Sequence, residues 1–436
     1  MTIGLGDTSS VEIGPGDPGP DHIGPDTIDS DSVRPGGKLA TLCVHAGGGP
    51  EPVTGAINPP VFLSTTFVQD GPGQHRGYHY ARAGNPTRTV VERALADLEG
   101  ARHGFAFASG CAATTTVLLT LRSGDHVIVG KDIYSGTFRL LRNVFCDFAI
   151  EATFVDLRDP GELDRAIRPA TRMIWMETPS NPLLEVADLS AIGEVAQRRS
   201  LVLVVDNTFA TPILQRPLEY GATLVVHSTT KYLNGHCDVL GGAVLTDDNA
   251  LAQRLELLQK AVGAVPSPLD SYLLLRGLKT LAVRIRQQVE NARILARWLE
   301  GFSDIVRVHY PGLSSHPDHE LAARQMKGPG AIISVELAGG FAAARSFLQA
   351  MRLFSCAISL GGAESLAEHP ASMTHAAVPQ AVRRAVGISD GLVRLSIGLE
   401  DIDDLRADVE CALAATRCHN PPSVQRPGLA KEVSGE

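Results

Sequence analysis

The sequence has few aromatic residues, no long apolar run and no excess of basic residues. Aromatics make up 5% of its 436 residues, and no apolar segment approaches the roughly 18–20 residues of a membrane-spanning helix. Asp and Glu (48) outnumber Lys and Arg (39), which argues against a nucleic-acid scaffold with a basic face. The N-terminus lacks a basic stretch followed by an apolar one, so we expect no secretion.

Paired cysteines are also missing. The seven cysteines are dispersed and none forms a CxxC motif. This usage is typical of buried thiols in a reducing compartment, and we expect the protein to be cytoplasmic. The histidines show no spacing typical of a metal site, and the segment HCD at 236–238 is interpreted as structural. We therefore predict no metal.

Residues 1–37 differ in composition from the rest of the chain. They contain eight Gly, five Pro, six Asp and one Glu but a single Arg. Such a segment buries too little apolar surface to offset the entropy of ordering it. We expect an acidic, disordered leader at 1–37. Residues 419–436 are similar and are expected to form a flexible tail.

Between residues 86 and 285, patterns typical of helices alternate with short apolar runs. The helical segment that starts at Pro86 follows Asn85, a residue type that favours the N-cap position. Strands are expected at 105–108, 126–129, 172–177, 201–206 and 223–228. Apolar strands separated by helices are typical of a parallel sheet covered on both faces. We predict one α/β domain at 86–285.

A second, smaller α/β domain is expected at residues 286–418. A long helix at about 279–300 leads into it. Strand patterns follow near 305–308, 331–336 and 392–397, and helical patterns separate them. The final helix covers the segment DIDDLRADVECALAA.

Polar residues follow two of the predicted strands of the first domain. Asp206 ends the apolar run LVLVVD, and Ser228, Thr230 and Lys231 follow the run TLVVH. Open parallel sheets place their chemistry at the carboxyl ends of strands. Taken alone, a lysine beside hydroxyls is a surface feature, and no GxxxxGK[ST] loop indicates a triphosphate site. Together, an amine, an acid and hydroxyls are the groups that pyridoxal 5'-phosphate (PLP) requires.

Long motifs in a fixed order resemble the Cys/Met-metabolism PLP-dependent enzymes, which include cystathionine γ-synthases, cystathionine lyases and methionine γ-lyases. The similarity runs from about Leu39 to Leu413. It is carried by YARAGNPTR, ASGCAA, DIYSGTFRL, ETPSNPLL, VDNTFATP, HSTTKYLNGH, SLGGAESLAEHPASMTH and LVRLSIGLED. The resemblance implies an α/β protein of PLP fold type I, like aspartate aminotransferase, with a mainly parallel sheet in the large domain. It also implies a small amino-acid substrate and neither a nucleic-acid nor a membrane partner.

The resemblance assigns chemical roles to individual residues. Lys231 matches the lysine that binds the cofactor's aldehyde and moves protons along the substrate, which requires a lowered pKa. Asp206 matches the acid that pairs with the pyridinium nitrogen. Tyr134, which alone would be interpreted as a core aromatic, matches the tyrosine that stacks on the cofactor ring and acts as an acid or base near the leaving group. The predicted catalytic residues are therefore Lys231 and Tyr134.

The cofactor's phosphate is expected at the start of a helix. The motif ASGCAA lies between a strand and a helix, so Gly110 and Cys111 can offer backbone N–H groups to an anion. Ser228 and Thr230 add hydroxyl groups. Cys111 replaces the family's usual Met, and we expect little effect because only its amide would be used.

Tyr80 and Arg82 match a pair that, in this family, reaches in from the neighbouring subunit. Residues 38–85 would then form an N-terminal arm that contributes to the neighbouring active site. A site completed by a second subunit implies an obligate dimer, and the family is usually a homotetramer built from two such dimers.

The substrate's α-carboxylate requires a planar, two-pronged cation. Arg394 matches the arginine that fills this role in the family. The resemblance adds Asn181 and Ser359 as supporting residues.

Substrate choice is expected to depend on side chains near the substrate's far end. Relatives that process cystathionine or cysteine commonly carry Glu at the position of Ile358, and a second acid often stands at the position of His79. Both changes remove negative charge. Methionine γ-lyases carry an apolar residue at the first position but a cysteine where this chain has Gly136. Arg139 matches an arginine of the cystathionine enzymes, so some polar recognition stays open.

We therefore expect a PLP-dependent carbon–heteroatom lyase that eliminates or replaces a nonpolar or halide-like γ-substituent of an L-amino acid. One relative makes propargylglycine, a terminal alkyne, from a chlorinated allylglycine in antibiotic and other natural-product biosynthesis, and this chain fits such a role. The alternatives are a cystathionine γ-synthase or γ-lyase of transsulfuration, and a methionine γ-lyase. A PLP-binding scaffold without activity is disfavoured by the intact Lys231, Tyr134 and Arg394.

Overall fold

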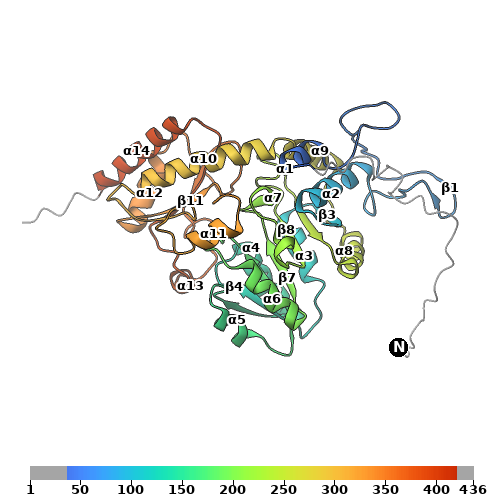
Figure 1. Cartoon of the computed structure of the whole chain (residues 1–436), viewed down its shortest axis with the longest axis horizontal. Coiled ribbons are helices and arrows are strands. Elements are labelled where there is room, and N and C mark those ends of the chain that lie inside the picture. Colours follow the sequence, from blue (N-terminus) through green and yellow to red (C-terminus); the bar gives the residue numbers. More distant parts are fainter. Residues whose placement is uncertain (1–36, 420–436) are drawn as a thin grey trace, which may run out of the picture.

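The computed structural model describes residues 37–419 (Figure 1). Apart from their innermost residues, the predicted leader (1–37) and tail (419–436) lie outside this range. The helices are α1 (Leu39–His45), α2 (Pro86–Glu99), α3 (Gly110–Leu118), α4 (Ser135–Asn143), η2 (Phe145–Phe148), α5 (Pro160–Ala166), α6 (Leu189–Arg199), α7 (Thr211–Leu214), η3 (Pro217–Tyr220), α8 (Asn249–Val262), α9 (Pro268–Leu278), α10 (Leu281–Leu299), α11 (His319–Gln325), α12 (Gly340–Ala350), α13 (Gln380–Ala385) and α14 (Ile402–His419). The strands are β1 (Gln69–Gly71), β2 (Gln74–His75), β3 (His103–Phe107), β4 (His126–Gly130), β5 (Glu151–Val155), β6 (Thr171–Glu177), β7 (Val202–Asp206), β8 (Leu224–His227), β9 (Gly242–Thr246), β10 (Ile305–His309), β11 (Ile332–Leu337), β12 (Ser355–Cys356), β13 (Leu366–Glu368) and β14 (Leu392–Ser396). None of these helices within 37–419 has the length and apolarity needed to cross a bilayer.

The larger sheet confirms the prediction of a mainly parallel sheet. Its strand order is β3-β9-β8-β7-β6-β4-β5. The pairs from β8 to β5 are parallel, whereas β9 runs antiparallel to both β8 and β3. Each strand expected between 105 and 228 forms within two residues of its predicted bounds. Val117 of α3, Leu141 of α4 and Leu255 of α8 pack in one core cluster, and Leu163 of α5 and Ile192 of α6 pack in another.

The smaller sheet lies in the C-terminal part of the chain. Its order is β10-β11-β14-β13-β12, with β12 and β13 parallel and the other pairs antiparallel. The strands expected near 305–308, 331–336 and 392–397 are β10, β11 and β14. Helices α12 and α14 pack against each other, and α12 also contacts β11 and β14.

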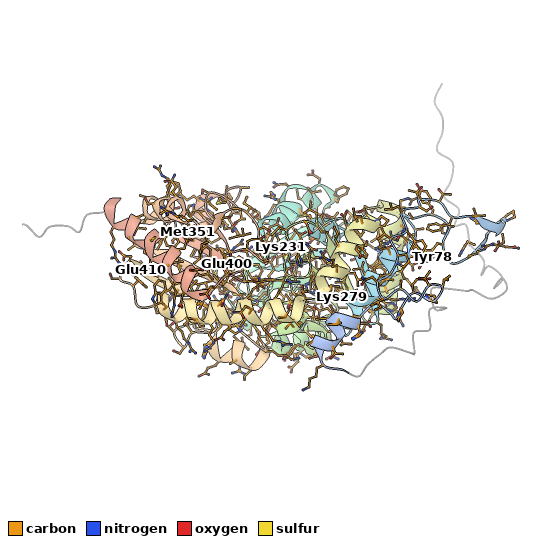
Figure 2. All side chains as sticks on the ribbon, turned by 90° about the horizontal axis from the view of Figure 1, so that it is seen from above. Tyr78, Lys231, Lys279, Met351, Glu400 and Glu410 are labelled. Carbon is orange, nitrogen blue, oxygen red and sulfur yellow. The ribbon has the colours of Figure 1, made fainter. Side chains whose placement is uncertain are left out.

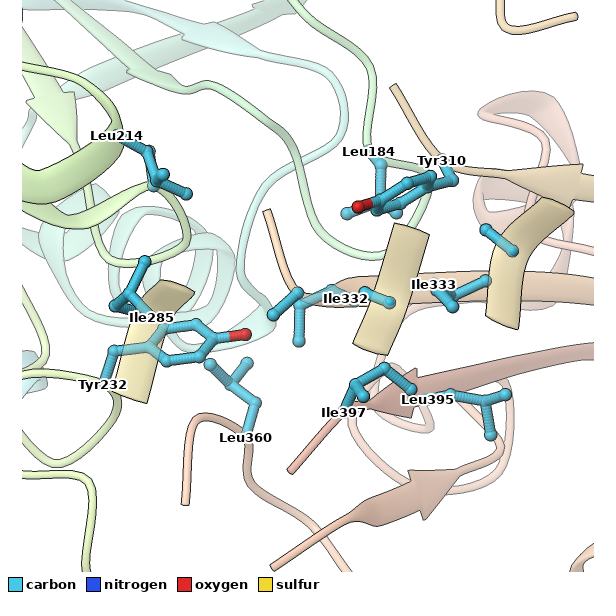
Figure 3. Packing of buried hydrophobic residues seen from close by; sticks show 14 of the residues in the cluster. Leu184, Leu214, Tyr232, Ile285, Tyr310, Ile332, Ile333, Leu360, Leu395 and Ile397 are labelled. Carbon is cyan, nitrogen blue, oxygen red and sulfur yellow. The ribbon is translucent and has the colours of Figure 1, made fainter. Parts of the chain in front are cut away.

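One apolar core joins the two sheets. Tyr232, which follows β8, and Ile285 of α10 belong to the same buried cluster as Ile332 and Ile397 of the smaller domain (Figure 3). Helix α10 is continuous across position 285, so the predicted boundary between the domains falls inside a helix. Because interiors are close-packed, this shared core fixes the small domain against the segment after β8.

The start of α2 anchors the preceding segment. Asn85 is the N-cap, as predicted, and its side chain accepts hydrogen bonds from the backbone N–H groups of Thr87 and Arg88. The Asn85 amide also donates to the carbonyl oxygen of Phe62. The segment from about 46 to 85, which contains β1 and β2, extends from one end of the molecule (Figure 1).

Candidate active site

A cavity of about 310 Å³ lies at the carboxyl ends of β6, β7 and β8, where the small domain covers the larger sheet. This is the edge at which parallel sheets place their chemistry. The predicted site residues that line it are Gly110, Cys111, Tyr134, Arg139, Asn181, Asp206, Ser228, Thr230, Lys231, Ile358, Ser359 and Arg394. A larger cavity, of about 580 Å³, lies beside β10 and includes none of them.

The Lys231 amine lies in the cavity, just after β8. Its Nζ donates a hydrogen bond to Ser359 Oγ at 2.8 Å. Burial lowers the pKa of Lys231 to about 8, and the positive charge of Arg394 adds to this effect. A lysine with this pKa is partly neutral near physiological pH, which a nucleophile or proton acceptor requires.

Two buried carboxyl groups lie side by side at the sheet edge. Glu177 ends β6 and Asp206 ends β7, and the two residues are register partners. Burial raises the pKa of Asp206, while hydrogen bonds from Thr208 oppose this shift. Burial and the neighbouring Asp206 raise the pKa of Glu177 well above its usual value, so Glu177 is the one that stays protonated. Asp206 is then the carboxylate available to a cationic ring nitrogen.

Glu177 is a cavity residue that sequence reasoning missed. Its Oε1 accepts a hydrogen bond from the backbone N–H of Tyr134 at 2.8 Å, at the start of α4. Tyr134 is 39% exposed and lines the cavity, and burial of its hydroxyl raises its pKa. The available signal was the position of Glu177 at a strand end, next to the strand that carries Asp206.

The start of α3 forms an anion cradle. The helix begins at Gly110, after the N-cap Ser109, whose hydroxyl accepts from the backbone N–H of Ala112. A Cβ atom at Gly110 would lie 2.9 Å from Cβ of Ser228, so only glycine fits. The backbone N–H groups at a helix start bind anions such as phosphate. Ser228 and Thr230 line the same cavity.

Arg394 on β14 presents a buried guanidinium to the cavity. Its Nη1 donates to Asn181 Oδ1 at 2.9 Å, and its Nη2 donates to the backbone oxygen of Ser359 at 2.8 Å. Glu368, a second residue that sequence reasoning missed, forms an ion pair with Nη1 at 3.0 Å. Both side chains of this pair are almost fully buried. The arrangement suits a planar carboxylate ligand.

The structure does not bring His79, Tyr80 and Arg82 into this cavity. Tyr80 is 44% exposed, and Arg82 donates to the backbone oxygen of Lys260. Figure 2 shows Tyr78 of the same segment near one end of the molecule, whereas Lys231 lies in the middle. These residues therefore do not complete the site of their own chain.

The cavity residues fit PLP. The Lys231 amine can bind an aldehyde, Asp206 can hold a pyridinium nitrogen, and the start of α3 with Ser228 and Thr230 can hold a phosphate. Tyr134 lies where an aromatic side chain can cover a ring. Within residues 37–419, no group of three His, Cys, Asp or Glu side chains is arranged to hold a metal ion.

The lowered pKa of Lys231 predicts a measurable effect on stability. In the unfolded chain a lysine has a pKa of about 10.4, so between about pH 8 and pH 10 the unfolded state binds more protons than the folded state. Stability therefore rises with pH in this window. At pH 7, replacing Lys231 by Met in cofactor-free protein should raise the free energy of unfolding by about 2–3 kcal/mol.

Denaturant unfolding between pH 7 and pH 10 measures this difference. The gain from Lys231→Met should shrink as the pH rises through the window. Lys327→Met, which removes an exposed amine, is the matched control and should have little effect at any pH. If Lys231→Met raised the free energy of unfolding by the same amount at every pH, the effect would not come from the charge of Lys231.

Comparison with known proteins gives consistent matches along most of the chain. The family model of the Cys/Met metabolism PLP-dependent enzymes matches residues 40–414. The chain is 52% identical over 377 residues to the cystathionine beta-lyase of Coxiella burnetii, covering 86% of this chain and 97% of that protein. It is 50% identical over 376 residues to the cystathionine gamma-synthase of Mycobacterium tuberculosis, covering 86% of this chain and 96% of that protein.

A solved structure agrees with these matches. The cystathionine gamma-lyase from Lactobacillus plantarum, complexed with L-serine, is 44% identical and superposes with a TM-score of 0.86, covering 87% of this chain and 100% of that chain. PLP fold type I is thereby confirmed, and the family implies pyridoxal 5'-phosphate as the cofactor. The chain belongs to the Cys/Met metabolism PLP-dependent enzymes, and it is an enzyme of the γ-lyase or γ-synthase type.

Proposed function

We propose that this enzyme eliminates or replaces the γ-substituent of an L-amino acid whose side chain ends in an apolar or halide group. The observation that carries this proposal is the lining of the cavity. Ile358 and Leu240 line it and are 61% and 66% exposed, and Met373 adds a third apolar side chain. Among its lining residues within 37–419, only Glu177 and Asp206 are acidic, and both belong to the strand ends.

Different residues of this chain would carry out different steps of such a reaction. Bound PLP supplies an electron sink for the charge that develops at the substrate's Cα. Arg394 would hold the α-carboxylate, which orients the substrate. The neutral amine of Lys231 would accept a proton from Cα, would release that proton to the bound cofactor, and as a neutral amine again would accept one from Cβ. Tyr134 lines the same cavity and would stand near the departing group, where its hydroxyl can donate a proton.

The apolar lining disfavours a substrate with a charged far end. When a second copy of the chain covers this end of the cavity, as proposed below, an ammonium held against Ile358 would exchange water for alkyl groups without gaining a counter-ion, and an unpaired buried charge is costly. A methylthio group or a chlorine has no such penalty. A chlorinated allylglycine, whose elimination would leave a terminal alkyne, is a substrate of this class.

Cystathionine is the second candidate substrate. The two curated relatives at 50–52% identity are named for reactions of cystathionine, and so is the matched solved structure. Arg139 of α4 lines the cavity and can bind the far carboxylate of such a substrate. Under this alternative the chain acts as a cystathionine γ-synthase or γ-lyase of transsulfuration.

A substrate panel tests the proposal. Purified protein should carry PLP with visible absorbance, and Lys231→Ala should lose both the covalent attachment and turnover. Cystathionine, O-succinylhomoserine, methionine and a γ-chloro allylic amino acid would be compared by release of ammonia or keto acid. Preference for the last two supports an apolar side-chain end. Exclusive turnover of cystathionine would refute the proposed preference for an apolar side-chain end. Failure to bind PLP would refute the proposed class of reaction.

Replacing Ile358 by Glu should change the substrate preference. The new carboxylate would be a counter-ion for a distal ammonium, so the ratio of kcat/KM for cystathionine over methionine should rise at least about tenfold, equivalent to about 1.4 kcal/mol. Leu353→Glu adds the same charge outside the cavity and serves as the control. An unchanged ratio in Ile358→Glu would place specificity elsewhere.

We also propose that a second copy of the chain completes the site. The N-terminal segment carries apolar side chains that are 81–88% exposed, namely Val53, Ile57 and Val68. Exposed apolar side chains gathered in one segment are typical of an interface that a partner covers. Tyr80 and Arg82 lie in the same segment and away from their own cavity. A neighbouring subunit would cover the apolar side chains and receive this pair, and two such dimers would form the tetramer.

Complementation between two inactive variants tests the shared site. Arg82→Ala and Lys231→Ala should each lose most activity alone. Co-expressed, they should form mixed dimers with one intact site, restoring about a quarter of wild-type activity at equal expression. No recovery, with mixed dimers shown to be present, would mean that each chain builds its site by itself.

A further inference from the structure

The counter-ion of Arg394 comes from the adjacent strand. Glu368 ends β13 and is the register partner of Arg394 on β14. Glu368 Oε1 lies 3.0 Å from Arg394 Nη1 and also accepts a hydrogen bond from the Thr374 hydroxyl at 2.9 Å. The side chains of both charged residues are at most 2% exposed. The pair is therefore nearly neutral as a whole while no ligand is bound.

The hydrogen-bonding capacity of the pair is not used up. A guanidinium has five N–H groups, and Arg394 donates hydrogen bonds to Asn181 and to the backbone of Ser359, while Glu368 is its ion-pair partner. Arg394 Nε has no hydrogen-bond partner among the described residues. On the other side, Glu368 Oε2 is buried and likewise has none there. Arg394 can thus donate hydrogen bonds to a second carboxylate while Glu368 stays its ion-pair partner. The Oε2 atom of Glu368 is then available to carry a proton.

A second carboxylate changes the charge balance of this buried cluster. Two carboxylates and one guanidinium sum to −1, and a net charge out of water is unfavourable unless a proton neutralises it. We propose that Glu368 takes up one proton from solvent, on Oε2, when the substrate's α-carboxylate binds Arg394. One O–H bond forms on Glu368, and the bond between this proton and the buffer acid or water that supplies it breaks. This inference rests on the proposed function, in which Arg394 holds the substrate's carboxylate.

Several other titratable groups lie around the pair, and of these Lys231, whose amine can also take up a proton, is left unchanged in the variant Glu368→Gln used below. Those that face the pair are Lys231 and Tyr232 after β8, Tyr134 before α4, His375 after β13 and the exposed Cys356 on β12. Burial raises the pKa of both tyrosine hydroxyls, so they stay neutral. Burial and the charge of Arg394 lower the pKa of His375 to about 4, so its neutral ring is a weak proton acceptor.

The state of Glu368 in the unliganded site agrees with a group poised to accept a proton. Burial raises its pKa, whereas Arg394, the Thr374 hydroxyl and Lys231 oppose this shift. A bound carboxylate would cancel the effect of Arg394, which is the strongest of the opposing ones. Glu368 acts on the substrate through Arg394 and is therefore a positioning residue.

Calorimetry measures the proton directly. L-norvaline, an amino acid without a leaving group, would be titrated into holoenzyme at pH 8 in phosphate and in Tris, whose ionisation enthalpies differ. The buffer dependence gives the number of protons taken up on binding. Wild type should take up about one proton more than Glu368→Gln, because the amide mimics the protonated carboxyl. Glu364→Gln, an exposed neighbour outside the cavity, is the matched control and should equal wild type.

Kinetics give a second, independent readout. Above the pKa of Glu368, binding has to include proton uptake, so the wild-type KM should rise with pH. Glu368→Gln should flatten this rise and lower KM at pH 9 by about fivefold or more, with kcat within about twofold. Glu368→Ala, which also removes the ion-pair partner of Arg394 Nη1, should raise KM at every pH. If Glu368 had a merely structural role, Glu368→Gln and Glu368→Ala would both raise KM by the same factor at every pH.

The outcomes separate this inference from the proposed function. Equal proton numbers in wild type and Glu368→Gln would overturn the role of Glu368 even if the enzyme turns over amino acids normally. A proton difference confined to Glu368→Gln supports the role even if the preferred substrate differs from the one proposed. Absence of any norvaline binding to wild-type holoenzyme would overturn both.

Discussion

The site depends on the apolar core that the two domains share. Lys231 extends from the end of a parallel strand in the larger sheet, whereas Ser359 and Arg394 belong to the smaller domain. Neither sheet alone creates the cavity between them. Tyr232, the neighbour of Lys231 in the chain, is fully buried in the same cluster as Ile332 and its neighbours. Packing of the Tyr232 side chain therefore fixes the position of the neighbouring Lys231 against the small domain.

The charged groups of the site are stable only as a set. Lys231, Asp206, Glu177 and Arg394 are all at least partly buried, and burial disfavours the charged form of each one. Of these four groups, Arg394 is neutralised by pairing with a buried acid, Glu368. Glu177 gives up its charge, Arg394 keeps a buried counter-ion, and Lys231 is left with a lowered pKa. Burial of these groups lowers the free energy of unfolding of the empty site. The same burial lowers the pKa of Lys231, so its amine can react near neutral pH.

The sequence allowed prediction of most elements, and the family resemblance added Asn181, Ser359 and Arg394, which also line the cavity. Asp206, Ser228 and Lys231 could be placed because apolar runs of parallel strands end directly before them, and such ends meet at one edge. The predicted N-cap at Asn85 also follows from local chemistry. Glu177 ends a predicted strand next to the one that carries Asp206, so its position was a signal, whereas Glu368 ends a three-residue strand that the sequence pattern did not predict. Their burial results from packing between strands distant in sequence.

Overall identity does not decide the substrate of this enzyme. Relatives about equally similar to the chain are named for a β-lyase and a γ-synthase reaction. The residues around Lys231 and Arg394 serve features that all amino-acid substrates of PLP enzymes share, namely the amino group and the α-carboxylate. Amino-acid substrates of this family differ at their far ends, and we propose that Ile358, Leu240 and Arg139, two apolar side chains and one charged one that line the cavity, distinguish between them. Under the proposed function, the charge at this end, rather than the common machinery, sets which γ-substituent the site accepts.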